Sequence, residues 1–249
     1  MTQPTLTDRL RLRQRPTGRP ALRQRWQDLL FLHWAVEPEL IQRTLPPGLT
    51  VDTFEGRAYL GIVPFFMRGI RPNFLPPIPG ISNFLETNVR TYVYDAHGAP
   101  GVWFYSLEAN QGLAIWVART FYKLPYWRAD MHARLSPVGL LDYHVQRRGT
   151  QTGSRFWYAA RGDIFSAEPD TLAFFLVERY LLYAATGRGL AAGQVYHTPY
   201  PIQSAQVEAW DAHLLTLNHF TDLQRPPDHA LYSPGVNVEV FPLRLPTDA

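Results

Sequence analysis

Short apolar and aromatic runs, separated by prolines and glycines, dominate the pattern of hydrophobic and polar positions along this chain. The run from Trp26 to Trp34 predicts a buried strand, because it is short, continuous and aromatic at both ends. Three hairpins are predicted, which join 49–54 to 58–66, 88–94 to 102–109, and 140–148 to 155–161. Further strand-like runs lie at 194–196, 205–210 and 236–241.

Two longer stretches have a helical period instead. Apolar residues recur with helical spacing in 112–122, and this helix is expected to end at Lys123 because Pro125 disfavours helical geometry at the residue before it. The strongest helical pattern spans 170–187, with Asp170 as its N-cap and Gly187 as its stop. A short helix is expected after Pro38, and the proline-rich 67–80 is expected to be a stiff irregular loop.

No internal repeat or low-complexity linker divides the chain. Strands joined as hairpins, with helices inserted singly, predict one α+β domain over 26–249. Its sheet should be mainly antiparallel and closed or half-closed into a barrel.

Charge separates the first 25 residues from this domain. Residues 1–25 carry seven arginines and one aspartate, a local balance of +6, which leaves −3 for the rest of a chain whose formal charge is +3. We therefore expect a flexible basic N-terminal arm, which is either solvated or in contact with an anionic partner. The slightly acidic domain argues against nucleic-acid binding, which needs basic residues on a face of the fold.

Composition excludes several other classes. The chain has no cysteine, so disulfides, thiolate metal sites and cysteine nucleophiles are absent. No apolar segment approaches the ~20 residues of a membrane span, and a cytoplasmic location is the default expectation. Nucleotide-binding and hydrolase motifs are missing, and no two histidines lie four residues apart, so neither a metal nor a cofactor is predicted. The sequence leaves open whether the protein forms a homo-oligomer.

Lys123 is the only lysine in the 249 residues and lies among aromatic side chains. A lysine held against apolar and cationic neighbours has a lowered pKa, which suits a nucleophile or base. A lysine at the end of a helix also interacts favourably with the last carbonyl groups, with no role in chemistry. Both interpretations are compatible with the residues alone.

Several charged residues interrupt otherwise apolar runs, and such groups are normally paired. Glu178 and Arg179 are expected to form an ion pair that anchors a helix to the sheet. Glu86 and Arg90 lie near the start of a hairpin strand, where a pocket position and a structural position are both possible. His197, in a proline-rich turn, is either an acid/base group or a histidine that hydrogen-bonds the backbone.

Residues 28–242 resemble the uncharacterised YqjF-like family, which is related to acetoacetate decarboxylase. The segments that carry the resemblance are Ala118-Arg119 followed by Leu124-Pro125-Tyr126, Phe175 to Tyr183, His197 to Gln203, and Tyr232 to Val238. The resemblance implies an acetoacetate-decarboxylase-like fold, a conical antiparallel barrel around an apolar pocket with a few peripheral helices.

The more distant decarboxylase has an arginine, then a proline six residues later, then two lysines, of which the first forms a Schiff base. Arg119 and Pro125 match the arginine and the proline, but Tyr126 and Trp127 stand at the two lysine positions. Tyrosine donates a hydrogen bond but cannot form an iminium, so the resemblance implies that the Schiff-base pair is missing. Glu86 aligns with the pocket glutamate of the decarboxylase.

Our first functional hypothesis is a pocket for a small, largely apolar metabolite, such as an oxo acid or another carboxylated molecule. The expected ligand-binding residues are Tyr126, Glu86, Arg119, Trp127, Arg90 and His197. The second hypothesis is a lyase or hydratase that uses Lys123 as an amine, or Tyr126 and Glu86 as an acid/base pair. The third is a partner-binding module that acts through the arginines of 1–25.

Overall fold

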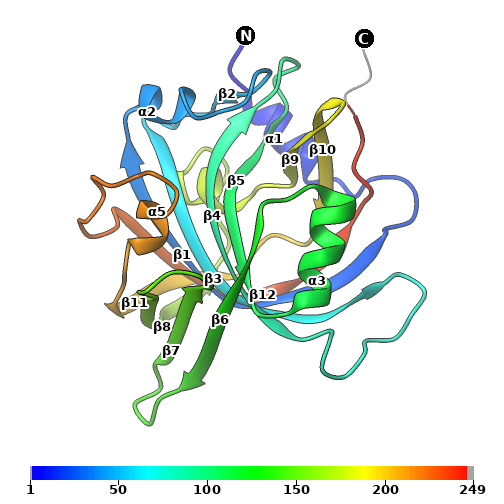
Figure 1. The fold of residues 1–249 in the computed structure, drawn as a ribbon. Coiled ribbons are helices and arrows are strands. Elements are labelled where there is room, and N and C mark those ends of the chain that lie inside the picture. Colours follow the sequence, from blue (N-terminus) through cyan, green and yellow to red (C-terminus); the bar gives the residue numbers. More distant parts are fainter. Residues whose placement is uncertain (1, 246–249) are drawn as a thin grey trace.

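The computed structural model describes residues 2–245 and consists mainly of one large sheet with a few short helices (Figure 1). The strands are β1 (Leu22–Val36), β2 (Thr50–Val51), β3 (Ala58–Pro72), β4 (Phe84–Tyr94), β5 (Pro100–Ala109), β6 (Tyr126–Leu135), β7 (Leu141–Arg147), β8 (Ser154–Phe165), β9 (Leu181–Thr186), β10 (Gly189–Tyr196), β11 (Ile202–Ala209) and β12 (His229–Val240). The helices are α1 (Leu6–Leu12), α2 (Pro38–Gln42), α3 (Gly112–Val117), the π-helix η1 (Ala118–Tyr122), α4 (Leu172–Val177) and α5 (His213–Thr216).

The sheet closes on itself. Its strand order is β10-β9-β5-β6-β7-β8-β11-β12-β1-β3-β4-β2, and additional pairings of β10 with β12 and of β5 with β4 complete rings of strands. All pairings are antiparallel except those of β5 with β6 and with β9. The predicted mainly antiparallel α+β fold is therefore confirmed.

The central strands are buried on both faces, which explains their continuous apolar runs. Along β1, Leu29 and Phe31 belong to one core cluster, whereas Leu30, Leu32 and Trp34 belong to another. Alternate side chains of one strand therefore point to opposite faces. The first cluster contains much of the inner surface of the sheet, where the cavity described below is found.

Several predicted elements are confirmed. The strand at 26–34 lies within β1, the hairpin of 88–94 with 102–109 is β4–β5, and that of 140–148 with 155–161 is β7–β8. The helix at 112–122 occurs as α3 followed by η1, and it ends at Lys123, whose φ of 53° is left-handed. Strand β6 follows at once and was not predicted.

The helix predicted over 170–187 is wrong beyond Val177. Helix α4 has only six residues, and Leu181–Thr186 is strand β9, which pairs with β10 and, in parallel, with β5. The chain from Phe174 to Tyr180 is buried throughout. A segment enclosed on all sides pairs its backbone with neighbouring strands, and this tertiary pairing overrides the local helical pattern.

Two further predictions need correction. Strand β2 pairs with β4, at Thr50 with Tyr94, so residues 49–54 do not form a hairpin ladder with β3. Only an isolated bridge joins Phe54 to Arg57. Strand β3 continues to Pro72 through pairing with β1, so the irregular loop covers 73–83 rather than 67–80.

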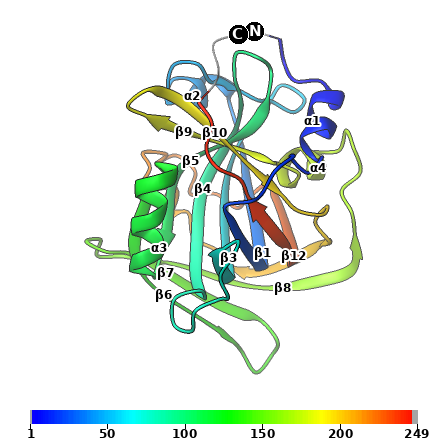
Figure 2. The same cartoon turned by 90° about the vertical axis from the view of Figure 1, so that its right-hand side faces the viewer.

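The N-terminal residues differ from the predicted flexible arm. They form α1 and the start of β1, and α1 lies beside α4 (Figure 2). Arg9 pairs with Asp52 and stacks on Phe175, and Arg15 pairs with Glu239. Arg9 and Arg15 thus join the segment to the domain, because carboxylates and an aromatic ring of the domain attract their guanidinium groups. Met1 lies outside the described residues. Within residues 2–245, no helix is long and apolar enough to span a membrane.

Candidate functional site

A cavity of about 350 Å³ lies inside the sheet and is lined mainly by apolar side chains. Its walls include Trp26 of β1, Met67 of β3, Leu107 of β5 and Val195 of β10. Leu75 and Ile78 in the loop 73–83 and Leu113 of α3 also line it, and these three are exposed, so the mouth lies between this loop and α3.

Strand β4 contributes two ionisable side chains to the cavity lining, and the geometry of the strand explains their position. Side chains two residues apart point to the same face of a strand. Phe84, Glu86 and Arg90 accordingly all line the cavity. Glu86 is 3% exposed and Arg90 is 8% exposed, so each ionisable group is almost withdrawn from water.

Glu86 is hydrogen-bonded to Tyr126, whose hydroxyl donates to Oε2 of Glu86 at 2.8 Å. Burial raises the pKa of Glu86 to about 8, although the hydrogen bond from Tyr126 opposes the shift. Burial also raises the pKa of Tyr126 well above its usual value. At neutral pH the pair is therefore mostly uncharged, and the protonated carboxyl of Glu86 can donate a hydrogen bond to a ligand oxygen.

Arg90 lies deeper along β4. Its Nη2 donates to the carbonyl oxygen of Leu176 at 3.2 Å, and its guanidinium carbon lies 5.5 Å from the ring centre of Phe31 and 5.6 Å from that of Tyr92. Within the described part of the chain, its Nε has no acceptor. No carboxylate in residues 2–245 lies within ion-pair distance of Arg90.

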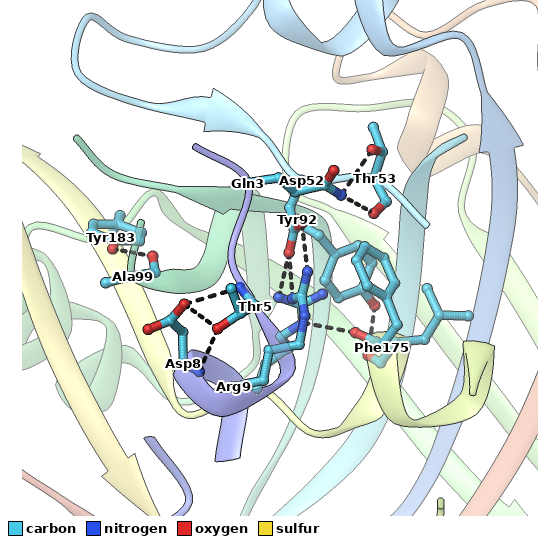
Figure 3. Close-up of polar contacts among 12 residues, drawn as sticks. Gln3, Thr5, Asp8, Arg9, Asp52, Thr53, Tyr92, Ala99, Phe175 and Tyr183 are labelled. Atoms are coloured by element: carbon cyan, nitrogen blue, oxygen red, sulfur yellow. Dashed lines mark hydrogen bonds and ion pairs between the residues drawn. The ribbon is translucent and has the colours of Figure 1, made fainter. Parts of the chain in front are cut away.

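Arg179 is a cavity residue that the sequence did not identify as one. Its partner is Asp52 rather than the predicted Glu178: Nη1 donates to Oδ2 of Asp52 at 2.7 Å. Arg9 of α1 donates to both oxygens of the same carboxylate, beside Tyr92 and Phe175 (Figure 3). The carboxylate of Glu178 instead accepts hydrogen bonds from Tyr180 and from the backbone of Tyr200. An arginine between large apolar residues was the available signal, but its partner lies far away in sequence.

Four of the predicted site residues lie outside the cavity lining, and three of them are exposed. Lys123 is exposed at the left-handed end of η1. Arg119 is exposed and donates to the backbone oxygen of Tyr126, so it secures the start of β6. Trp127 is 44% exposed and stacks with Arg147. The strand alternation of β6 explains the contrast, since Tyr126 points inward and Trp127 outward.

His197 is buried but also lies outside the cavity lining. Its Nδ1 lies 2.7 Å from the carbonyl oxygen of Thr198, and its ring stacks on Tyr180 at 4.6 Å between centres. Burial lowers the pKa of His197 to about 4, so the ring is neutral at pH 7. This geometry matches the backbone-bonded alternative. Among the described residues, no group of three or more histidine and acidic side chains could hold a metal ion.

Comparison with solved structures identifies the type of fold. The structure matches the enduracididine biosynthesis enzyme MppR complexed with pyruvate, with a TM-score of 0.63 at 15% identity over 92% of this chain and 91% of that one. It also matches an acetoacetate decarboxylase-like enzyme from Sphingomonas wittichii RW1 (TM-score 0.62, 13% identity, 92% and 94% coverage) and acetoacetate decarboxylase from Legionella pneumophila (0.59, 12%, 92% and 88%). The fold is acetoacetate-decarboxylase-like, as the resemblance implied.

The sequence comparison is more specific. Residues 23–237 match the DUF2071 family of uncharacterised conserved proteins. The chain is 38% identical over 210 residues to the uncharacterised protein YqjF of Bacillus subtilis (strain 168). This match covers 81% of this chain and 85% of that protein. The chain therefore belongs to the DUF2071 family.

Proposed function

We propose that the cavity binds a small, largely apolar molecule that bears a carbonyl or another oxygen acceptor. The observation that carries the proposal is the Glu86–Tyr126 pair, a buried carboxyl hydrogen-bonded to a buried hydroxyl inside a cavity lined mainly by apolar side chains. Ligand sites of this kind combine apolar walls with a few polar groups that fix orientation.

The chemistry of the pair favours an oxygen acceptor. Tyr126 occupies Oε2 of Glu86, so the remaining carboxyl oxygen is the one available to a ligand. When Glu86 is protonated, a proton on this oxygen is a strong donor to a carbonyl, and no charged group has to be desolvated. Oxo acids meet this requirement, and a structural neighbour is described as complexed with pyruvate.

The proposal does not include a Schiff base. By the resemblance, Tyr126 and Trp127 stand where the decarboxylase has its lysine pair, and the chain's only lysine is exposed outside the cavity lining. An amine must be within reach of the carbonyl carbon to form an iminium. We therefore expect borohydride reduction in the presence of acetoacetate to leave the peptide that contains Lys123 unmodified.

A thermal-unfolding screen with acetoacetate, phenylpyruvate and phenylacetate tests the binding function. A ligand at 100 times its dissociation constant stabilises the folded state by about 2.7 kcal/mol, which raises the unfolding temperature. Glu86→Leu should abolish the response to the oxo acids, whereas Glu208→Gln, at an exposed position on β11, should retain it. The absence of a response from all three compounds in the wild-type protein would contradict the proposal.

The same pair supports a second candidate function, acid/base catalysis of a lyase or hydratase type. A carboxyl whose pKa is raised to about 8 can both donate and accept a proton near neutral pH. Solvent deuterium exchange at the carbon next to the carbonyl of phenylpyruvate, followed by NMR, measures such proton transfer. The exchange should be faster with the wild-type protein than with Glu86→Gln; equal rates would argue for binding alone.

A further inference from the structure

We infer that the inner end of the cavity, at Arg90, is a subsite for the carboxylate of an elongated, largely apolar monocarboxylic acid. The inference rests on the proposed binding function and specifies its ligand class. It is carried by a buried cation that has no anionic partner in the described part of the chain.

Arg90 has no means to avoid the cost of its burial. A guanidinium remains protonated in proteins, and a buried charge is normally paired with an opposite charge. Arg90 has instead one carbonyl acceptor, on Leu176, and the faces of Phe31 and Tyr92. These contacts solvate the cation in part, and they leave other N–H groups of a cavity-lining side chain for a ligand.

A second guanidinium lies close to that of Arg90. The guanidinium carbon of Arg179 lies 5.0 Å from the ring centre of Tyr92, the same ring that Arg90 contacts. Asp52, which is fully buried, already accepts hydrogen bonds from both Arg179 and Arg9. This cluster therefore contains three guanidinium groups and one carboxylate, and an anion that enters it is attracted by the excess charge.

The arrangement along β4 sets the length of the ligand. Glu86 and Arg90 are four residues apart on one face, which separates their Cα atoms by roughly 13 Å. The guanidinium of Arg90 contacts Tyr92, the next inward residue beyond it, whereas Glu86 bonds to Tyr126. A carboxylate at Arg90 thus lies several carbon atoms from an oxygen at Glu86. A medium-chain acid whose second oxygen is remote from its carboxylate can reach both groups, whereas a 2-oxo or 3-oxo acid reaches Glu86 alone.

The direction of entry agrees with this orientation. Helix α1 lies toward one end of the sheet and the loop 73–83 toward the other in both views (Figures 1 and 2). Arg9 of α1 belongs to the charged cluster, and the apolar mouth is formed by Leu75, Ile78 and Leu113. The carboxylate would therefore enter first, with the apolar tail toward the mouth.

Calorimetric titration of the full chain with octanoate and with octan-1-ol at pH 7.5 tests the subsite. The two probes share an apolar tail, and only octanoate carries the charge. Wild-type protein should bind octanoate at least tenfold more tightly than octan-1-ol. Arg90→Met should weaken octanoate binding at least tenfold and leave octan-1-ol binding unchanged, and Arg90→Lys should keep part of the preference. Arg68→Met is the matched control, since Arg68 also stacks on an aromatic ring but does not line the cavity.

The comparison of octanoate with octan-1-ol in the wild-type protein tests the subsite even if a variant does not fold. Equal affinity for the two probes, or a preference for octanoate that survives in Arg90→Met, would overturn the carboxylate subsite while the apolar cavity stands. If neither octanoate nor octan-1-ol binds, while phenylpyruvate stabilises the protein, the subsite is also overturned and the proposed function is retained. Failure of every probe would overturn both.

Discussion

The ionisable groups at the two polar ends of the cavity respond differently to burial. At the outer end, Glu86 is hydrogen-bonded to Tyr126, and burial raises the pKa of its carboxyl to about 8. At the inner end, Arg90 is buried to a similar degree, and Arg179 shares the buried Asp52 with Arg9. One end can lose its charge by taking up a proton, and the other cannot.

This difference shows how one strand face can offer two kinds of contact. A carboxyl in an apolar environment takes up a proton and becomes a neutral donor. An arginine keeps its charge, so the structure must supply a carboxylate, aromatic faces or a ligand. Asp52 serves Arg179 and Arg9 in this way, whereas the contacts of Arg90 within residues 2–245 are a backbone carbonyl, two aromatic rings and the Tyr92 hydroxyl, none of them a carboxylate. The following variants test this contrast.

Asp52→Asn should have the largest effect, because it leaves the buried guanidinium of Arg179 and the largely buried guanidinium of Arg9 without a counter-charge. We expect a loss of about 3–5 kcal/mol in the free energy of unfolding, measured with urea. Asp142→Asn is the matched control. Asp142 also accepts hydrogen bonds from two arginines, but Arg134 and Arg155 have side chains that are 77% and 48% exposed, so the loss should be about 1 kcal/mol or less. Equal losses of unfolding free energy in the two variants would mean that burial of the paired arginines does not matter.

The pH dependence of stability tests the neutral end. The folded-state pKa of Glu86, about 8, is raised above the ordinary value of 4.5. Its contribution to stability is therefore complete below pH 4.5 and decreases as the pH rises to about 8, by at most about 1.4 kcal/mol per pH unit. Urea unfolding across this range should show a steeper decrease for wild-type protein than for Glu86→Gln. Parallel profiles would mean that Glu86 is ionised in the folded protein.

Tyr126→Phe should remove about 1–2 kcal/mol from the free energy of unfolding, since it leaves a buried carboxyl without its donor. The pKa of Glu86 should rise further, because the hydrogen bond from Tyr126 lowers it. Carboxyl carbon chemical shifts followed by NMR report this pKa directly. Tyr122→Phe is the control: Tyr122 lines the cavity, and its hydroxyl has no hydrogen bond within residues 2–245. A fall in the pKa of Glu86 on Tyr126→Phe would contradict the assigned pairing.

Lys123→Gly should have the smallest effect, and in the opposite direction. Lys123 has a φ of 53° at the end of η1, a conformation that glycine adopts without steric cost. We expect a gain of up to about 1 kcal/mol in unfolding free energy, with Lys123→Ala showing no such gain. Ligand-induced stabilisation should be unchanged in both variants, because Lys123 lies outside the cavity lining. Loss of ligand-induced stabilisation in both variants would indicate that Lys123 takes part in ligand binding.

Local pattern was sufficient where contacts between neighbouring elements decide the structure. The apolar run at 26–34, the β4–β5 hairpin and the end of the helix at Lys123 were all predicted from the residues. Pattern was insufficient at 170–187, where burial converts a helical period into strand β9. The role of Arg179 was equally hidden, since its partner Asp52 is 127 residues away in the sequence.

The sequence by itself therefore determined which side chains are apolar, the period that places Glu86 and Arg90 on one face of a strand, and the family to which the chain belongs. Only the tertiary structure decided that Tyr126 meets Glu86, that Arg119, Lys123 and Trp127 stay outside the cavity lining, and that α1 completes the charged cluster at Asp52. The reason is that desolvation and ion pairing depend on which distant segments enclose a group. Closure of the sheet alone brings those segments together.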